Sequence, residues 1–345
     1  MIVKRTEFLG FLDALKSGIT TGGEMDQMAN VQFTGVDMIT YNEQIGILVP
    51  FEADFAASIN HKDLVNIVSK LDAETFVMEL SGNELSISTE DTKAGLLTTG
   101  TEEIQQSIDE LIEQMPNEEN NGEWLLLPEN FSNGVGLCTP AAEKDLSKGI
   151  LACLSAFDNK LVCSDNKRIS VYEMSGSVDS EFLIRAGLVT NLTKLDLTNF
   201  YPSNSWVHFA TSDGIIFSVK RVSGDSLTMY AKLFVDFKGI SIDLPDGLKE
   251  IVGAASSMVA DDDTKDMRIY NEGKNLICAS SNERGWIERS VKANFSKKEK
   301  LDITVSSNYL NWVLDLPDIK MTLGENSSLF ESGNFKHIIQ HKASQ

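Results

Sequence analysis

The pattern of apolar and polar residues predicts the same short succession of elements three times along the chain. At 60–71, apolar residues recur three, four and seven positions apart, as on one face of a helix. Residues 75–89 then alternate around a Ser-Gly-Asn-Glu turn, which is typical of a β-hairpin. The same order of helix and hairpin is predicted at 185–220 and 306–332, with turns at 212–214 and 324–326.

The point where each helix meets its hairpin carries a similar phrase. The three versions read "KLDAETF" from Lys70, "TKLDLTNF" from Thr193 and "WVLDLPDI" from Trp312, about 120 residues apart. A repeat at this spacing indicates three copies of one structural unit.

The half of each copy that precedes this helix also follows a common order. Further helices are predicted at 4–17, 128–142 and 245–258, and each is followed by strand-like segments. The fold class is therefore α+β, with three repeated domains that each hold two helices and antiparallel sheet. We place the domains at 1–100, 122–226 and 227–345, with an acidic linker at 101–121.

The acidic linker has a helical pattern of its own. It carries acidic residues without a basic one, and its apolar residues Ile104, Ile108, Leu111 and Ile112 fit a short surface helix. We expect a solvated connector. A helix dedicated to binding a partner is the alternative.

Composition narrows the class of protein. Apolar residues make up 42% of the chain and charged residues 23%, as expected for a soluble globular protein. The net charge of −21 disfavours a protein coated in nucleic acid, although it leaves room for a local basic surface. The four cysteines lack metal or redox spacing, and no signal peptide or membrane-length apolar run is present, so we expect a cytoplasmic protein without disulfides.

Motifs for catalysis or cofactor binding are weak. "NGVGL" at 133–137 lacks a preceding strand and a phosphate-binding lysine, and "ADDDTKD" at 260–266 lacks the glycine and glutamate of a calcium loop. His337 and His341 could share a metal, but no third ligand lies nearby in the sequence. We therefore expect no enzyme activity, no cofactor and no metal.

Four segments in the right order resemble the β-subunit sliding clamp of bacterial DNA polymerase III. They are "INHKDLVNIVSKLDAETFVMELSGNELSIS", "GILACLSAFDNKLVCSDNKRISVYEM", "FVDFKGI" and "ITVSSNYLNWVLD". The resemblance covers nearly the whole chain and is distant, as in a phage-type member. It implies a head-to-tail homodimer whose six domains form a ring around duplex DNA. It also implies a replication processivity factor, with polymerase and clamp loader as partners that bind through short peptides.

The resemblance identifies helices that would face DNA without reading its sequence. Cations on these helices are the candidates for phosphate contact, namely Lys16, Lys62, Lys70, Arg185, Lys194 and Lys249. An ordinary solvated helix face is the alternative for each. The arginine that the family tends to carry after the first helix is absent from "GITTGGEMDQ".

The resemblance also implies a peptide-binding cleft between the second and third domains. Its positions are Leu151, Ser164, Asn166, Lys167, Arg168, Ile169, Val235, Ile240, Ile338 and Ile339. Val235 replaces the family's proline, and the Met-Pro-Met ending is replaced by Gln340-His341-Lys342, so the peptide preference is expected to differ. The alternative, an ordinary core residue, applies to Ile169 in particular.

The family's ring contact maps onto Ile67, Ala94 and Leu96. An aromatic residue is usual at Ala94, so its absence predicts a weaker dimer. Two other hypotheses remain at this point. One is a clamp-derived protein-interaction module that no longer encircles DNA. The other is an unrelated β-rich structural repeat protein, which the paired helices disfavour.

Overall fold

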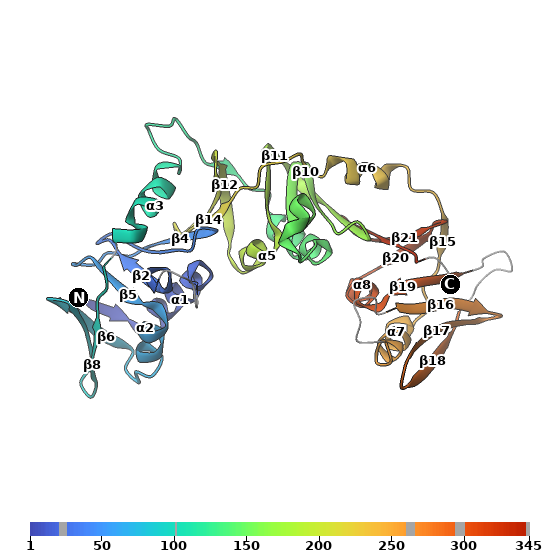
Figure 1. The fold of residues 1–345 in the computed structure, drawn as a ribbon, viewed down its shortest axis with the longest axis horizontal. Helices are drawn as coiled ribbons and strands as arrows, with labels where there is room; N and C mark the ends of the chain where they lie inside the picture. The colour runs from blue at the N-terminus through green and yellow to red at the C-terminus, as the bar shows by residue number, and fades with distance from the viewer. Residues whose placement is uncertain (21–25, 101, 260–265, 294–300, 343–345) are drawn as a thin grey trace. The chain divides into compact units, whose positions relative to one another are not determined.

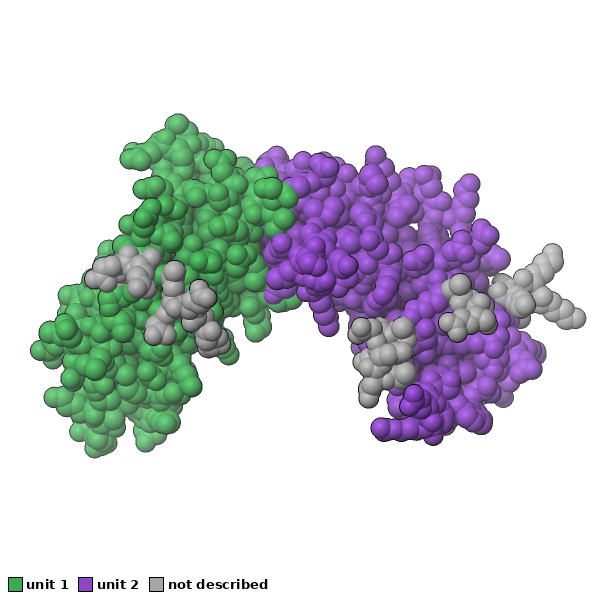
Figure 2. Space-filling model, in the orientation of Figure 1, with its two compact units in different colours: residues 1–132, 188–223 green, residues 133–187, 224–345 purple. Residues whose placement is uncertain are grey.

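The structure is a computed structural model that describes residues 1–20, 26–100, 102–259, 266–293 and 301–342. The chain forms two compact units, coloured separately in Figure 2. Unit 1 combines Met1–Ser132 with Leu188–Ser223, and unit 2 combines Asn133–Gly187 with Gly224–Gln345. The middle of the chain therefore contributes to both units.

An antiparallel sheet of eight strands lies at the centre of unit 1, in the order β5-β2-β3-β4-β14-β13-β12-β9. Strands from the first and the second repeat share this sheet, because β4 pairs with β14 and sets Ile47 opposite Phe217. The strands are β2 (Asn30–Phe33), β3 (Asp37–Tyr41), β4 (Ile45–Pro50), β5 (Ala57–Asn60), β9 (Leu125–Leu126), β12 (Leu197–Pro202), β13 (Trp206–Thr211) and β14 (Ile216–Lys220).

A second sheet of unit 1 has four strands in the order β1-β6-β7-β8. Its strands are β1 (Ile2–Lys4), β6 (Thr75–Ser81), β7 (Glu84–Ser88) and β8 (Lys93–Leu97). The helical segments of unit 1 are α1 (Arg5–Leu15), η1 (Lys16–Gly18), η2 (Asp26–Ala29), α2 (His61–Val68), α3 (Glu102–Glu113) and η5 (Thr190–Lys194).

α1 and α2 form because apolar residues recur along one face of each helix. Phe8, Leu12 and Leu15 of α1 are fully buried, and the hydroxyl of Thr40 on β3 donates to the carbonyl of Leu15. The side chain of Asn60 caps α2 by accepting a hydrogen bond from the backbone N–H of Asp63. These helices therefore cover one face of the eight-stranded sheet (Figure 1).

α3 covers the other face of that sheet. Its residues Ile104, Ile108 and Leu111 are at most 2% exposed, and they pack with Tyr41 and Trp206. The helix is confirmed, but the expectation of a solvated connector is wrong. Apolar residues three and four positions apart find an apolar sheet face beneath them, so burial outweighs the acidic outer face.

Unit 2 contains a six-stranded sheet in the order β10-β11-β22-β21-β20-β15 and a four-stranded sheet in the order β18-β17-β16-β19. The first sheet contains β10 (Cys153–Ser164), β11 (Arg168–Arg185), β15 (Ile240–Ile242), β20 (Lys320–Leu323), β21 (Ser327–Ser332) and β22 (Phe335–Gln340). The second contains β16 (Asp266–Glu272), β17 (Asn275–Asn282), β18 (Gly285–Lys292) and β19 (Asp302–Ser306).

The helices of the second and third repeats complete the fold. They are α4 (Phe131–Cys138), η3 (Thr139–Ala141), η4 (Leu146–Ala152), α5 (Ala186–Val189), α6 (Thr228–Val235), α7 (Leu248–Ser256), α8 (Ser307–Asn311) and η6 (Val313–Asp315). Val252 of α7 and Leu310 of α8 join Met267, Leu276 and Val305 in the apolar core of unit 2. α7 packs against β17, β18 and α8.

The observed elements confirm the three repeats and both helices in each. The position predicted for the hairpin turn of the second repeat is wrong. Residues 212–214 join β13 to β14, whereas the turn that corresponds to the β6–β7 turn lies at 203–205, between β12 and β13. Both turns contain polar residues between alternating strands, so the sequence pattern does not distinguish them. "NGVGL" lies within α4, where Gly134 lets the helix approach Tyr172 closely. Residues 260–265 of "ADDDTKD" lie outside the described residues.

Candidate nucleic-acid and partner interfaces

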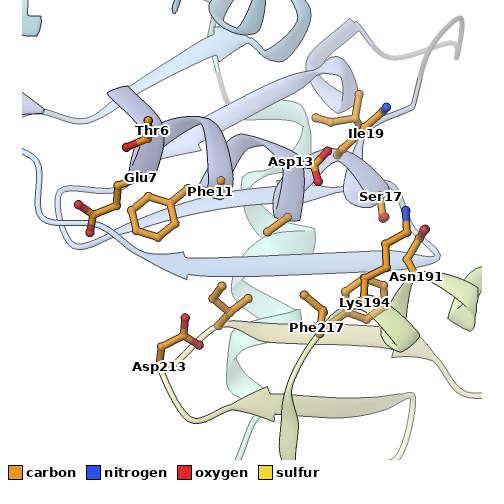
Figure 3. A pocket seen from close by; sticks show the side chains of 15 residues that line it. Thr6, Glu7, Phe11, Asp13, Ser17, Ile19, Asn191, Lys194, Asp213 and Phe217 are labelled. Atoms are coloured by element: carbon orange, nitrogen blue, oxygen red, sulfur yellow. The ribbon is translucent and has the colours of Figure 1, made fainter. Parts of the chain in front are cut away.

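Two predicted DNA-facing lysines line one groove of about 750 Å³ in unit 1. Lys16 begins η1 and Lys194 ends η5, and both side chains are exposed. Figure 3 shows Lys194 and Asn191 reaching from η5 towards η1, with Phe11 of α1 on the same groove. The fold therefore brings together two cations that are far apart in the sequence.

A neighbouring groove of about 700 Å³ lies between α1 and α2. Lys16 lines this groove as well, together with Lys62 and the apolar side chains of Leu9 and Val65. Lys62, Lys16 and Lys194 thus lie along one connected helical surface, which we call the lysine row. Acidic side chains also line these grooves, namely Glu7, Asp13 and Asp213. The lysine row is cationic in parts and is not a uniformly basic surface.

The other three predicted cations differ in their surroundings. Lys70 is exposed just beyond the end of α2. Lys249 forms a hydrogen-bonded ion pair with Asp315, and this contact raises the pKa of the lysine. The guanidinium of Arg185 donates to the carbonyls of Leu146 and Gly149 at 3.1 and 3.2 Å. Lys249 and Arg185 therefore already have partners within the chain.

The turn between β10 and β11 positions the polar residues of the predicted cleft. Asp165 accepts hydrogen bonds from the backbone N–H groups of Lys167 and Arg168, and it forms an ion pair with the Arg168 guanidinium at 3.0 Å. This guanidinium lies 4.2 Å from the ring centre of Tyr309, which is a cation–π contact. Asn166 adopts a φ of 67°, and its side chain accepts a hydrogen bond from Tyr230 of α6 at 2.7 Å. Contacts with Tyr309 of α8 and Tyr230 of α6 therefore hold the turn in place.

The apolar residues of the predicted cleft fall into two groups. Ile169, Ile338 and Ile339 are at most 7% exposed, and Ile169 packs against residues of α6. Val235 and Ile240 are instead 83% and 53% exposed. A peptide could therefore contact Val235 and Ile240 directly, whereas the three isoleucines lie within the core. Leu151 is half-buried, and the buried Ser164 donates to the carbonyl of Arg168.

Two further exposed apolar residues lie on α6 and were missed by sequence reasoning. Met229 and Leu233 lie one turn apart on α6, and they are 75% and 53% exposed. Because almost every position of α6 is apolar or aromatic, the sequence pattern did not show which side faces solvent. Together with Val235 at the end of α6 and Ile240 on β15, these exposed apolar residues of the segment 229–240 are called the α6 patch.

The residues predicted at the ring contact lie on and beside an edge strand. Ala94 and Leu96 are half-buried on β8, which is the last strand of its sheet, and Ile67 is half-buried on α2. α2 packs beside β8. One strand edge and one helix thus present these residues together.

The histidines that could have shared a metal have other partners. His337 is buried and shares a hydrogen bond of 2.8 Å with Ser170, while His341 shares one with Ser328. No cluster of three or more possible metal ligands occurs within the described residues. The four cysteines are free and buried. In the described part of the chain, no helix is both long enough and apolar enough to span a membrane.

Comparison with known proteins identifies the fold. Neither a scan against protein-family models nor a search of curated proteins found a match. The structure is similar to the DNA polymerase III β subunit of Pseudomonas aeruginosa, with a TM-score of 0.81 at 14% identity over 100% of both chains. It is similar to the DNA polymerase sliding clamp of Bacillus subtilis, with a TM-score of 0.82 at 14% identity over 100% of this chain and 99% of the other. A DnaN sliding clamp of Bartonella birtlesii bound to griselimycin gives 0.84 at 16% identity, also over 100% and 99%.

Proposed function

The chain has the fold of the DNA polymerase III β-subunit sliding clamps over its full length, and we propose that it acts as a sliding clamp. Two copies would close a ring around duplex DNA and tether a replicative polymerase as a processivity factor. The observation that carries this proposal is the similarity over the whole of both chains. A topological link keeps the polymerase near its template without base-specific contacts.

The role would be structural and not enzymatic, in the cytoplasm and without a cofactor. Polymerase and clamp loader would bind through short peptides. The α6 patch supports this part of the proposal, because it offers exposed apolar side chains on and after the helix that Tyr230 joins to Asn166 of the Asp165–Arg168 turn. The domain limits 1–100, 122–226 and 227–345 and the linker at 101–121 belong to the same proposal.

The test of encirclement uses circular DNA. A clamp loader should place the protein on a nicked circle, where it should stay during gel filtration. Cutting the circle once should release the protein within minutes, because only topology holds it. Equal retention on cut and uncut DNA would contradict the proposal.

A second candidate function is a clamp-derived interaction module that binds peptides but does not encircle DNA. Lys249 and Arg185 favour it, because both side chains are engaged within the chain. The two functions differ in the same experiment: the interaction module would bind a short apolar peptide but would not be retained on the closed circle.

Reversing the charge of the lysine row should weaken the contact with DNA. The variant carrying Lys16→Glu and Lys194→Glu should bind duplex DNA about tenfold more weakly at 0.15 M salt, because two phosphate contacts are lost. The slope of log affinity against log salt concentration should fall by about two. Fluorescence anisotropy over a salt series measures both quantities.

Lys274→Glu serves as the matched control, since Lys274 is exposed at the turn between β16 and β17. The control should keep the slope of the parent protein. An unchanged slope in the double variant would show that the lysine row does not contact phosphate.

A further inference from the structure

The groove of about 750 Å³ in unit 1 is formed by the first and second repeats together. One wall consists of α1 and η1, and the other consists of η5, the start of β14 and the turn before it (Figure 3). The pairing of β4 with β14 joins the two repeats at this point. Its volume is that of an ordinary ligand pocket. We call it the α1–η5 groove.

The middle of the α1–η5 groove is apolar. Phe217 of β14 and the neighbouring Ile215 are buried, while Phe11 and Ala14 of α1 are half-buried on the opposite wall. Gly10 keeps this wall low, since no atom lies within 4 Å of the Cβ that another residue would place there. Apolar side chains of a ligand would therefore find both space and apolar contacts.

The two ends of the groove differ in charge. Figure 3 shows Glu7 and Asp213 towards one end and Lys194 towards the other, with Asp13 between them. Lys194 reaches towards η1, which begins with Lys16. The groove is therefore acidic at one end and mainly basic at the other.

This distribution of charge selects a class of ligand. A nucleic acid strand is a poor fit, because its regularly spaced phosphates would meet Glu7 and Asp213 as well as the lysines. A small anion would use only the basic end. A peptide that carries a basic residue, apolar residues and an acidic residue in line would match the whole groove.

The length of the groove sets the length of that peptide. Glu7 and Lys16 are nine positions apart along α1 and its continuation η1. This separation corresponds to about 14 Å at about 1.5 Å per residue. An extended chain covers the same distance in about four steps of about 3.4 Å, so about five residues suffice.

We propose that the α1–η5 groove binds an extended peptide of a partner protein, in which an acidic and a basic residue flank about three residues with apolar side chains. The predicted cleft, by contrast, consists of residues of unit 2. The inference does not depend on the proposed ring, because every lining residue belongs to unit 1. Since Lys194 is also part of the lysine row, the peptide and DNA would compete for it.

The first test is a methyl NMR titration of the full chain with capped peptides. The probes are acetyl-Glu-Leu-Ala-Leu-Lys-amide and the peptide of reverse order. One of them should shift the signal of Ile215 with a dissociation constant below about 1 mM, and should leave Ile303 in unit 2 unchanged. Acetyl-Gln-Leu-Ala-Leu-Gln-amide should bind at least about fivefold more weakly. If neither charged peptide saturates by about 5 mM, the proposal is overturned.

The second test blocks the groove. Gly10→Leu should weaken peptide binding at least about tenfold, because the new side chain occupies the groove. The helix should remain folded, since leucine favours a helix more than glycine does.

Gly253→Leu is the matched control for the blocked groove. Gly253 is exposed within α7, has equally open space at its Cβ position and lines neither groove of unit 1. The control should bind the peptide like the parent protein. Unchanged peptide binding by Gly10→Leu would show that the peptide binds elsewhere.

The third test reverses one charge at the acidic end. Glu7→Lys should weaken the peptide that contains lysine about fivefold, and should strengthen acetyl-Glu-Leu-Ala-Leu-Glu-amide by a similar factor. Glu79→Lys, at an exposed position of β6 outside the groove, should change neither. If Glu7→Lys tightens duplex DNA binding and leaves both peptides unaffected, the groove holds nucleic acid and the peptide proposal is wrong.

The outcomes also separate this site from the ring. A protein that binds the peptide in the α1–η5 groove but is not retained on closed circular DNA would contradict the ring and leave the groove proposal intact. A protein that is retained on the circle and binds neither charged peptide would contradict the groove proposal alone.

Discussion

Acidification from about pH 7.5 to about pH 4.5 is expected to lower the free energy of unfolding by about 5 kcal/mol through two buried histidines. Burial lowers the pKa of His337 from 6.5 to about 3, with a smaller contribution from the nearby Arg168 cation. Burial also lowers the pKa of His208 from 6.5 to about 4. Each Nδ1 shares a hydrogen bond of 2.8 Å with a serine hydroxyl. Within the described residues, the Nε2 of His337 is buried without a hydrogen-bond partner, whereas a hydrogen bond with the backbone of Gln114 partly opposes the lowering of the His208 pKa.

The sign follows from proton binding in the two states. Below about pH 6.5 the unfolded chain protonates both imidazoles, whereas the folded chain keeps them neutral until about pH 3 to 4. Stability is therefore complete above the unfolded pKa and falls as the pH drops through this window. His337 pairs with Ser170 in the junction of β11 with β22, so this junction should open early.

Urea unfolding at several pH values measures the effect. His337→Gln should lower stability modestly at neutral pH and remove about half of the histidine-dependent loss on acidification, because one titrating group is gone. Val305→Ala, a change to a buried residue of β19, is the matched control and should destabilise equally at every pH. An unaltered pH dependence in His337→Gln would contradict the prediction.

The second large effect is expected from Leu111→Ala in α3, at a cost of about 2–5 kcal/mol of stability. Leu111 is fully buried against the eight-stranded sheet, and Gly46 on β4 leaves the space that its side chain occupies. Truncation removes apolar contacts and leaves a cavity that the rigid sheet cannot close. Unfolding of unit 1 in urea should therefore begin at lower denaturant.

Ile112→Ala is the control on the same helix, because Ile112 is 39% exposed. It should cost less than about 1 kcal/mol. Equal small effects of both changes would show that α3 is a dispensable connector, as the acidic composition of the segment first indicated. Hydrogen exchange of the α3 amides would distinguish loss of this helix from global unfolding.

Much of the fold was predictable because the sequence repeats its own pattern. The stripe of Leu64, Val68 and Leu71 predicted α2, and Asn60 marked its start. Three copies of one helix–hairpin order predicted the three-part α+β fold. Chance similarity in a single segment would not recur in the right order three times.

The candidate sites were less predictable, because exposure is a property of packing. Ile169 and Val235 are both apolar and were both assigned to one cleft, yet α6 buries the first and leaves the second exposed. Lys249 and Lys16 are both cations on predicted helices, yet among the residues that the structure describes only Lys249 forms an ion pair, with Asp315 after α8. Neither difference has a signal in the local sequence.

The sequence by itself determined the elements, their order and their threefold repetition, because the spacing of apolar residues sets local structure. Only the tertiary structure decided what those elements face. It placed the acidic helix α3 on a core, aligned Lys62, Lys16 and Lys194 along one surface, and left β8 and β18 as the outermost strands of their sheets. These outcomes depend on contacts between residues far apart in the chain, which local periodicity does not encode.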